Sequence, residues 1–311
     1  MKAWMRVLGI KLTSKKWKKS MTFGLNDADI DLNINCTVHK YMSTLKDTAT
    51  IKINNLTYDK IIEIIKGEFY DIDILCGYKN NNISNIFSGG MLYISNQLNS
   101  DRTNTLIILC GSKMLARYGQ SRINLTLNSG INMYSAIEYV CRRAGMPNSN
   151  ISTQFKRQFL TDIMTINSTA TSWIDELCKQ NNSFIVNSDG TSNQTFSIFD
   201  SKLSNGRVIP LKKDNISLSG GVPRMTTDGL ELTLLPTFGF MCGDTIRIDN
   251  SIIDISISNK NDIPSNLGFQ LSPKGEYMIY EMEYTLQNRG NAFSLRLNCK
   301  NRERISKLVG K

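Results

Sequence analysis

Strict alternation of apolar and polar residues recurs along much of this chain of 311 residues. In "IDLNINCTVHK" the apolar residues Ile30, Leu32, Ile34, Cys36 and Val38 alternate with polar ones. Successive side chains of a β-strand point to opposite faces, so the pattern predicts a strand with one buried face and one solvent-facing face. A chain dominated by such segments is expected to fold into antiparallel barrels or sandwiches.

The first section of the chain contains several more segments of this kind. We predict strands at residues 3–12, 49–53, 71–78, 86–94 and 123–127. The run "TLIILC" (105–110) lacks polar alternation, and we expect it to be buried on both faces. Between the strands, "TYDKIIEIIKG" predicts a short helix with Thr57 as N-cap and Gly67 past its end.

From residue 128 the period changes from strand to helix. "SGINMYSAIEYVCRRAGMP" places apolar residues at helical spacing, with Gly145 in the C′ position and Pro147 beyond it. "STATSWIDELCKQNN" predicts a second helix, and the segment that follows predicts a hairpin around Asp189-Gly190. We therefore expect a small α+β unit here.

The last section returns to period-two alternation. Strands are predicted at residues 230–234, 246–248 and 253–257. "EYMIYEMEYTLQNRGNAFSLRLNCK" predicts a long hairpin whose inward residues follow one another at spacings of two: Met278, Tyr280, Met282, Tyr284 and Leu286, then Phe293, Leu295, Leu297 and Cys299. The predicted fold class is mainly β with α+β: β-barrel domains at 1–127 and 221–311 flank an α+β domain at 128–220.

Composition excludes several classes of protein. No apolar run approaches the roughly 18 residues of a membrane-spanning helix, and the basic segment 2–19 lacks the apolar region of a signal peptide. Seven cysteines lie far apart without a CxxC pair, so we expect free buried thiols in a reducing compartment. The net charge of +10 comes without a nucleic-acid-binding motif, which favours a solvated face or an acidic protein partner.

Residues that could support catalysis are sparse. The single histidine, His39, falls on the polar face of its strand, so neither a metal site nor a cofactor is expected. Two pairs of acids share strand faces, Asp71 with Asp73 and Glu281 with Glu283, and paired carboxylates at a suitable separation can cleave a glycoside. Spacing of two on the polar side of a strand is also what solvent exposure produces, and we expect no catalytic residue.

Three segments in order resemble one known family. "YDIDILCGYKNNNISNIFSGGMLYI" (70–94) is similar to the first-barrel hairpin of phage tail hub proteins, with a "GY" turn, a polar loop and an "IF.G" phrase. "NMYSAIEYVCRRAGMPN" and "TSWIDELCKQNNSFIVNSDG" resemble the family's middle domain. "GLELTLLPTFGFMCGDTIRID" and "KGEYMIYEMEYTLQNRGNAFSLRLNC" resemble its second barrel. The family is the late-control protein D and baseplate hub family, which is related to the base of type VI secretion spikes.

This resemblance implies two tube-like barrels and a structural role in a virion tail. In such hubs three copies form a ring that mimics sixfold symmetry and joins the hexameric tail tube to the threefold central spike, among other baseplate proteins. DNA would pass through the channel without specific binding, and assembly would occur in the bacterial host cytoplasm. Because no lysozyme-like domain or spike β-helix follows the second barrel here, we expect wall cleavage and puncture to belong to separate proteins.

The resemblance also selects residues that shape the two barrels. They are hairpin and turn positions rather than a chemical site: Gly77, Tyr78, Phe87, Gly89, Gly243, Asp244, Gly275 and Tyr277. A basic segment is expected to face protein partners rather than the channel: Lys15, Lys16, Lys18 and Lys19. Two other functions stay open, a tail-tip glycan hydrolase that uses the paired carboxylates and a nucleic-acid-binding module that uses the net charge.

Overall fold

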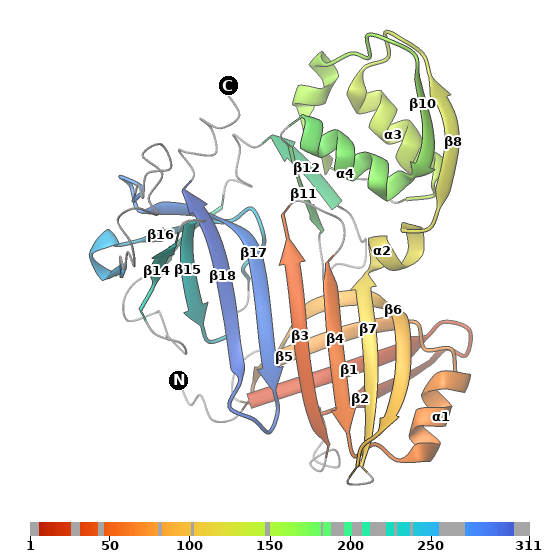
Figure 1. Ribbon diagram of the computed structural model, residues 1–311, viewed down its shortest axis with the longest axis vertical. Helices are drawn as coiled ribbons and strands as arrows, with labels where there is room; N and C mark the ends of the chain where they lie inside the picture. Colours follow the sequence, from red (N-terminus) through yellow and green to blue (C-terminus); the bar gives the residue numbers. More distant parts are fainter. Residues whose placement is uncertain are drawn as a thin grey trace.

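The alternating segments at both ends of the chain form one continuous sheet. The computed structural model describes residues 6–25, 32–42, 47–79, 83–100, 103–146, 150–181, 183–187, 196–200, 207–211, 222–226, 229–236, 239–254 and 271–301. Within them a 13-stranded sheet runs in the order β14-β15-β18-β17-β3-β4-β7-β6-β5-β1-β2, with β16 pairing with both β13 and β17 (Figure 1). Neighbouring strands of this sheet are antiparallel, except that β13 and β16 are parallel. The mainly β fold class is confirmed.

All but one of the strands of this sheet come from the first and last sections of the sequence. The first section supplies β1 (Arg6–Ser14), β2 (Lys19–Phe23), β3 (Asn33–Tyr41), β4 (Thr48–Asn54), β5 (Asp71–Tyr78), β6 (Ser84–Leu98) and β7 (Asn104–Ser112). The last section supplies β14 (Arg224–Thr226), β15 (Gly229–Leu234), β16 (Thr245–Ile248), β17 (Glu276–Gln287) and β18 (Phe293–Asn301). The remaining strand, β13 (Val208–Leu211), lies within the range 128–220 that was expected to form the middle domain. In Figure 1, β1 and β5 cross behind β3, β4 and β7, so the sheet curves around its own apolar face.

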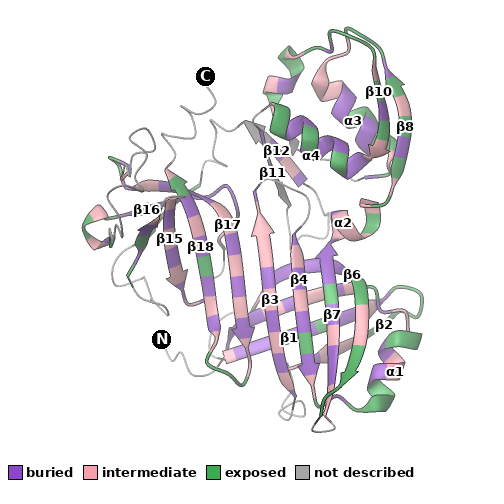
Figure 2. Ribbon diagram, viewed as in Figure 1, coloured by how far each residue is buried: buried purple, intermediate pink, exposed green. Residues whose placement is uncertain are grey.

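β17 joins the two β-rich regions. Its residues 281–287 pair with β3, its residues 277–286 pair with β18 around a bulge, and residues 276–278 pair with β16. One apolar cluster accordingly extends from β1 through β18 and includes the inward residues that the alternation predicted on β3 and β4 (Figure 2). The two regions therefore share a sheet and a core.

The middle unit has its own core. It contains α3 (Met133–Arg143), α4 (Ala170–Gln180), a 3-10 helix η2 (Thr153–Arg157), the pair β8 (Arg122–Leu127) and β10 (Met164–Thr169), and a three-stranded sheet of β9 (Asn150–Ile151), β11 (Ser183–Asn187) and β12 (Phe196–Asp200). Two further helices lie against the large sheet, α1 (Tyr58–Lys66) and α2 (Lys113–Tyr118), and η3 (Asn250–Ile252) follows β16. A second apolar cluster, from Met114 to Ile198, fills this unit.

The predicted helix boundaries follow capping chemistry. Thr57 is the N-cap of α1, as predicted, although its side chain makes no cap hydrogen bond. At the end of α3, Gly145 has the left-handed φ of 69° that its predicted C′ position requires. Gly145 N–H donates to the carbonyl of Arg142 and Met146 N–H to that of Cys141, which is the Schellman arrangement.

Three expectations about strands were wrong. β7 does not bury both faces, because it forms only one layer of the curved sheet and leaves Leu109 39% exposed. On β17 a bulge between Ile279 and Glu281 shifts the alternation, so Tyr280 is only half-buried. β8, expected in the first section, instead pairs with β10 and contributes to the middle cluster.

Other expectations lie outside the described residues. These are the Asp189-Gly190 turn and the strand residues Ile255 and Ile257. The domain boundaries at 127 and 220 stay predictions.

Truncation at the joint between the two β-rich regions should weaken both of them. Leu286 is buried on β17, opposite Cys36 of β3 and Phe293 of β18. We expect Leu286→Ala to lower the free energy of unfolding by about 2–5 kcal/mol and to raise amide exchange in β4 and β18 alike. Denaturant titration and hydrogen exchange measure this, with Leu98→Ala (71% exposed) as the control. Faster exchange confined to β15–β18 would contradict a shared core.

Candidate interaction site

The first predicted hairpin is tightly packed around its glycines. Gly77 lies opposite Val7 of β1, and Phe87 is fully buried opposite Ile74. A Cβ on Gly89 would collide with the carbonyl oxygen of Gly111 and with the Phe87 ring, so only glycine lets β6 approach β7 this closely. At this point the pairing of β6 with β7 therefore depends on a glycine.

Tyr78 connects the end of β5 to the β17–β18 hairpin. Its ring meets Phe293 edge to face at a centroid distance of 5.6 Å. The Arg6 guanidinium lies 5.2 Å from the Phe293 centroid and donates to the carbonyl oxygen of Gly290 at 3.1 Å. Burial raises the pKa of Tyr78, and its buried hydroxyl has no hydrogen-bond partner in the described part of the chain. This contact brings the beginning of the chain against its last hairpin.

The second predicted set lies at the other end of β17. Gly243 has a φ of 90°, and its N–H donates to the carbonyl of Ile279. The carboxylate of Asp244 is fully buried, accepts from the Met241 N–H at 2.8 Å and lies 3.6 Å from Arg207. The sequence predicted that Asp244 lies in a turn. In the structure its carboxylate stabilises that turn by accepting the Met241 N–H.

Gly275 and Tyr277 begin β17. Gly275 has a φ of 65°, and a Cβ there would collide with the carbonyl oxygen of Ile248. The buried Tyr277 hydroxyl donates to the Asn250 side chain and accepts from the Ser272 N–H, each at 3.1 Å. Burial is the main cause that raises its pKa. The first predicted set lies on β5 and β6 and the second lies around the start of β17, so the two sets do not form a single site.

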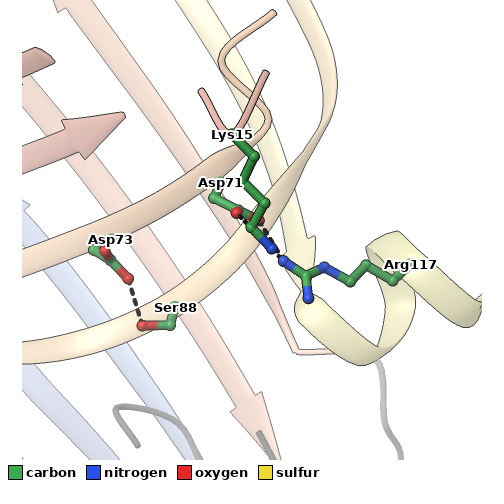
Figure 3. A network of polar contacts seen from close by, with 5 residues as sticks. All are labelled: Lys15, Asp71, Asp73, Ser88 and Arg117. Atoms are coloured by element: carbon green, nitrogen blue, oxygen red, sulfur yellow. Dashed lines mark hydrogen bonds and ion pairs between the residues drawn. The ribbon is translucent and has the colours of Figure 1, made fainter. Parts of the chain in front are cut away.

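The basic turn between β1 and β2 pairs with acids of the same chain (Figure 3). Lys15 lies 3.3 Å from Asp71, and Arg117 of α2 donates to the same carboxylate at 2.9 Å. Lys16 pairs with Glu68 at 2.6 Å, and Lys19 pairs with Glu63. The role of Arg117 was not visible in the sequence, because 46 residues separate it from Asp71.

Each candidate carboxylate has partners of its own. Asp71 forms ion pairs with Lys15 and Arg117, while Asp73 accepts a hydrogen bond from the Ser88 hydroxyl at 2.6 Å (Figure 3). Glu281 accepts from the Asn298 amide at 2.7 Å. Glu283 lies 3.9 Å from both Arg296 and His39. His39 thus faces β17 from β3, on the solvent side of the sheet.

The cysteines lie in the interior of the protein. All seven cysteines are buried, and none of them forms a disulfide within the described residues, as predicted. No group of three or more His, Cys, Asp or Glu side chains in the described ranges is arranged to hold a metal ion. None of the helices described above is both long and apolar enough to span a membrane.

The fold is shared with tail and secretion proteins. No protein-family model matches the sequence, and comparison with curated proteins finds no relative. Solved structures do match. The 43 kDa tail protein of prophage MuSo2 from Shewanella oneidensis has a TM-score of 0.58 at 9% identity, over 96% of this chain and 98% of that one. A tail protein of Neisseria meningitidis has a TM-score of 0.52 at 8% identity, over 95% and 96%.

Type VI secretion components show the same architecture. One from Escherichia coli, itself structurally similar to bacteriophage T4 tail proteins, has a TM-score of 0.55 at 9% identity, over 86% of this chain and 73% of that one. A chain of the Francisella PdpA-VgrG complex has a TM-score of 0.58 at 9% identity, and this protein spans 58% of its length. The expected resemblance to tail hub and spike-base folds is therefore confirmed at the level of the fold.

The buried thiols should be inert in the native protein. Burial raises the pKa of Cys76, Cys110 and Cys178 to about 12, so these groups are protonated at neutral pH. We expect none of the seven cysteines to react with a thiol reagent at pH 8 before unfolding. Because the folded pKa values lie above the ordinary thiol value of 9.0, these thiols stabilise the fold fully below pH 9 and progressively less as the pH rises toward 12. Counting labelled thiols with and without denaturant tests this, and a thiol that reacts in the native state would contradict it.

Proposed function

We propose that this protein is a structural hub of a phage or phage-like tail. The observation that carries the proposal is the end-to-end likeness in fold to a prophage tail protein, over 96% of this chain and 98% of that one. Its location is then the virion tail or baseplate, after assembly in the cytoplasm of the bacterial host. Fold alone does not fix function, so the proposal also needs a physical role for the geometry.

The role we propose is symmetry matching. Each copy contributes two β-rich regions that β17 holds in one sheet. Three copies in a ring present six such regions, which suits a hexameric tail tube on one side and a threefold spike on the other. A shared core between the regions resists shear, as a part that transmits force at the tail tip must do.

The edges of the sheet are the proposed contacts between copies. Within the described ranges β2 pairs only with β1, so its outer edge offers free backbone groups. Addition of a strand from a neighbouring copy would satisfy these groups and close the ring. DNA would pass through the channel without specific binding.

The oligomeric state provides the first test. We expect native mass spectrometry to detect a homotrimer, or a monomer that forms trimers only when the tail tube protein or the central spike protein is added. The reason is that strand addition and symmetry matching both require neighbouring copies. A chain that stays monomeric with both proteins present would overturn the proposed function.

The alternative function is a tail-tip glycan hydrolase. We propose that the protein is not an enzyme, because each candidate acid already serves a contact within the sheet. Glu281→Gln and Glu283→Gln are therefore expected to leave cell-wall lysis by assembled tails unchanged within about twofold, whereas a catalytic acid contributes about 10²–10⁴-fold. Turbidity loss of purified cell walls measures this, with Asp71→Asn/Asp73→Asn as the second pair. Abolished lysis in tails that still assemble would favour the hydrolase.

A further inference from the structure

The turn between β1 and β2 carries an exposed indole among four lysines. We propose that this turn, residues 15–19, is a docking tip that inserts Trp17 into an apolar pocket with an acidic rim on a neighbouring tail protein. The inference rests on the proposed function and names a contact surface for it. In Figure 1 the turn, drawn in red, projects beside α1 at the edge of the first β-rich region.

Contacts from three elements hold the turn in place. Lys16 pairs with Glu68, just beyond the end of α1, and Lys19 pairs with Glu63, within α1. Lys15 pairs with Asp71 of β5, which α2 also contacts through Arg117. At the base of the turn, the backbone N–H of Trp17 donates to the Ser14 hydroxyl at 3.3 Å. A tip ordered before binding loses less conformational entropy when a partner takes it up.

The ion pairs of the lysines in this turn indicate which class of partner the turn can bind. Affinity for phosphates grows with the number of cations that can neutralise them. Three of the four lysines already pair with carboxylates of this chain, and Lys18 alone has no acidic partner among the described residues. A surface built for nucleic acid or for an anionic membrane would leave its lysines available. The charge distribution therefore favours a protein partner that needs one cation and one aromatic anchor.

Trp17 has the properties of such an anchor. Its side chain is 60% exposed, while Trp173 is buried in the middle unit. The Lys16 ammonium lies 5.5 Å from the ring centroid, so a cation covers part of the indole and the rest faces solvent. Tryptophan is enriched among the few residues that dominate binding energy in protein interfaces.

The backbone at Lys18 allows charge and stability to be varied separately. Lys18 has a φ of 48°, a left-handed conformation that glycine adopts without strain and lysine does not. Asn55 and Glu68 also have positive φ values, so this conformation by itself does not mark a binding residue. Glycine at position 18 would remove the cation while easing the backbone.

Two variants separate binding from folding. Trp17→Ala should weaken binding to the tail tube protein or the central spike protein by roughly tenfold or more. Lys18→Gly should weaken the same binding by about two- to tenfold while its melting temperature stays equal to or above that of the wild type. Leu98→Ala, which removes another exposed apolar side chain at the end of β6, should change neither. Isothermal titration calorimetry and thermal melts of the full-length chain measure both quantities.

The outcomes distinguish this inference from the proposed function. If the wild type binds and Trp17→Ala binds equally well, the docking tip is wrong and the hub proposal stands. If the wild type binds neither protein and stays monomeric, the hub proposal fails and the docking tip with it. Vesicles of phosphatidylserine with phosphatidylcholine and a DNA duplex of about 20 base pairs serve as further probes. Binding to either that is lost in Trp17→Ala would identify a phosphate-bearing occupant and overturn the protein partner.

Discussion

The pairing of β17 with β3 is the contact on which the rest of the structure depends. β17 comes late in the chain and β3 early, yet residues 281–287 hydrogen-bond along 35–41 and place both β-rich regions in one sheet. The apolar cluster continues from one region to the other across this pair. The contact of Arg6 and Tyr78 with the β17–β18 hairpin is a second link between the two regions. The two regions thus share one sheet and one core, as the symmetry-matching role proposed above would require.

The middle unit is attached to this body at two places. α2 follows β7 directly, begins at the Ser112 cap and is held to β5 by the Arg117–Asp71 pair. Gly90 leaves room for Ala116 of α2, since a Cβ at Gly90 would overlap the Ala116 Cβ. On the other side, the Ile185 N–H of β11 donates to the carbonyl of Met42 at the end of β3. Short polar contacts therefore set the orientation of a unit that otherwise has a separate core.

Local pattern predicted the elements of this fold well and their partners poorly. Alternation identified the inward residues of β3, β4 and β18, because each reflects only the pleat of its own strand. The Tyr280 bulge was not predictable, since a bulge arises from the register between two strands. The assignment of β8 to the middle unit depends on its pairing with β10, about 40 residues later. The candidate site follows the same rule: the lysines of residues 15–19 were evident, but the acids that pair with them lie at residues 63–71.

Net charge illustrates how such pairing changes the meaning of a sequence feature. A value of +10 and a lysine-rich turn together suggest binding to phosphates. Folding brings Glu63, Glu68 and Asp71 to that turn, so most of its charge is used within the chain and what it still presents is mainly an indole. Exposed ion pairs contribute little to stability, about 0–1 kcal/mol each, so stability alone gives weak reason to gather them here. Their consequence here is one of placement, because they join the turn that carries the exposed Trp17 to α1 and to the start of β5.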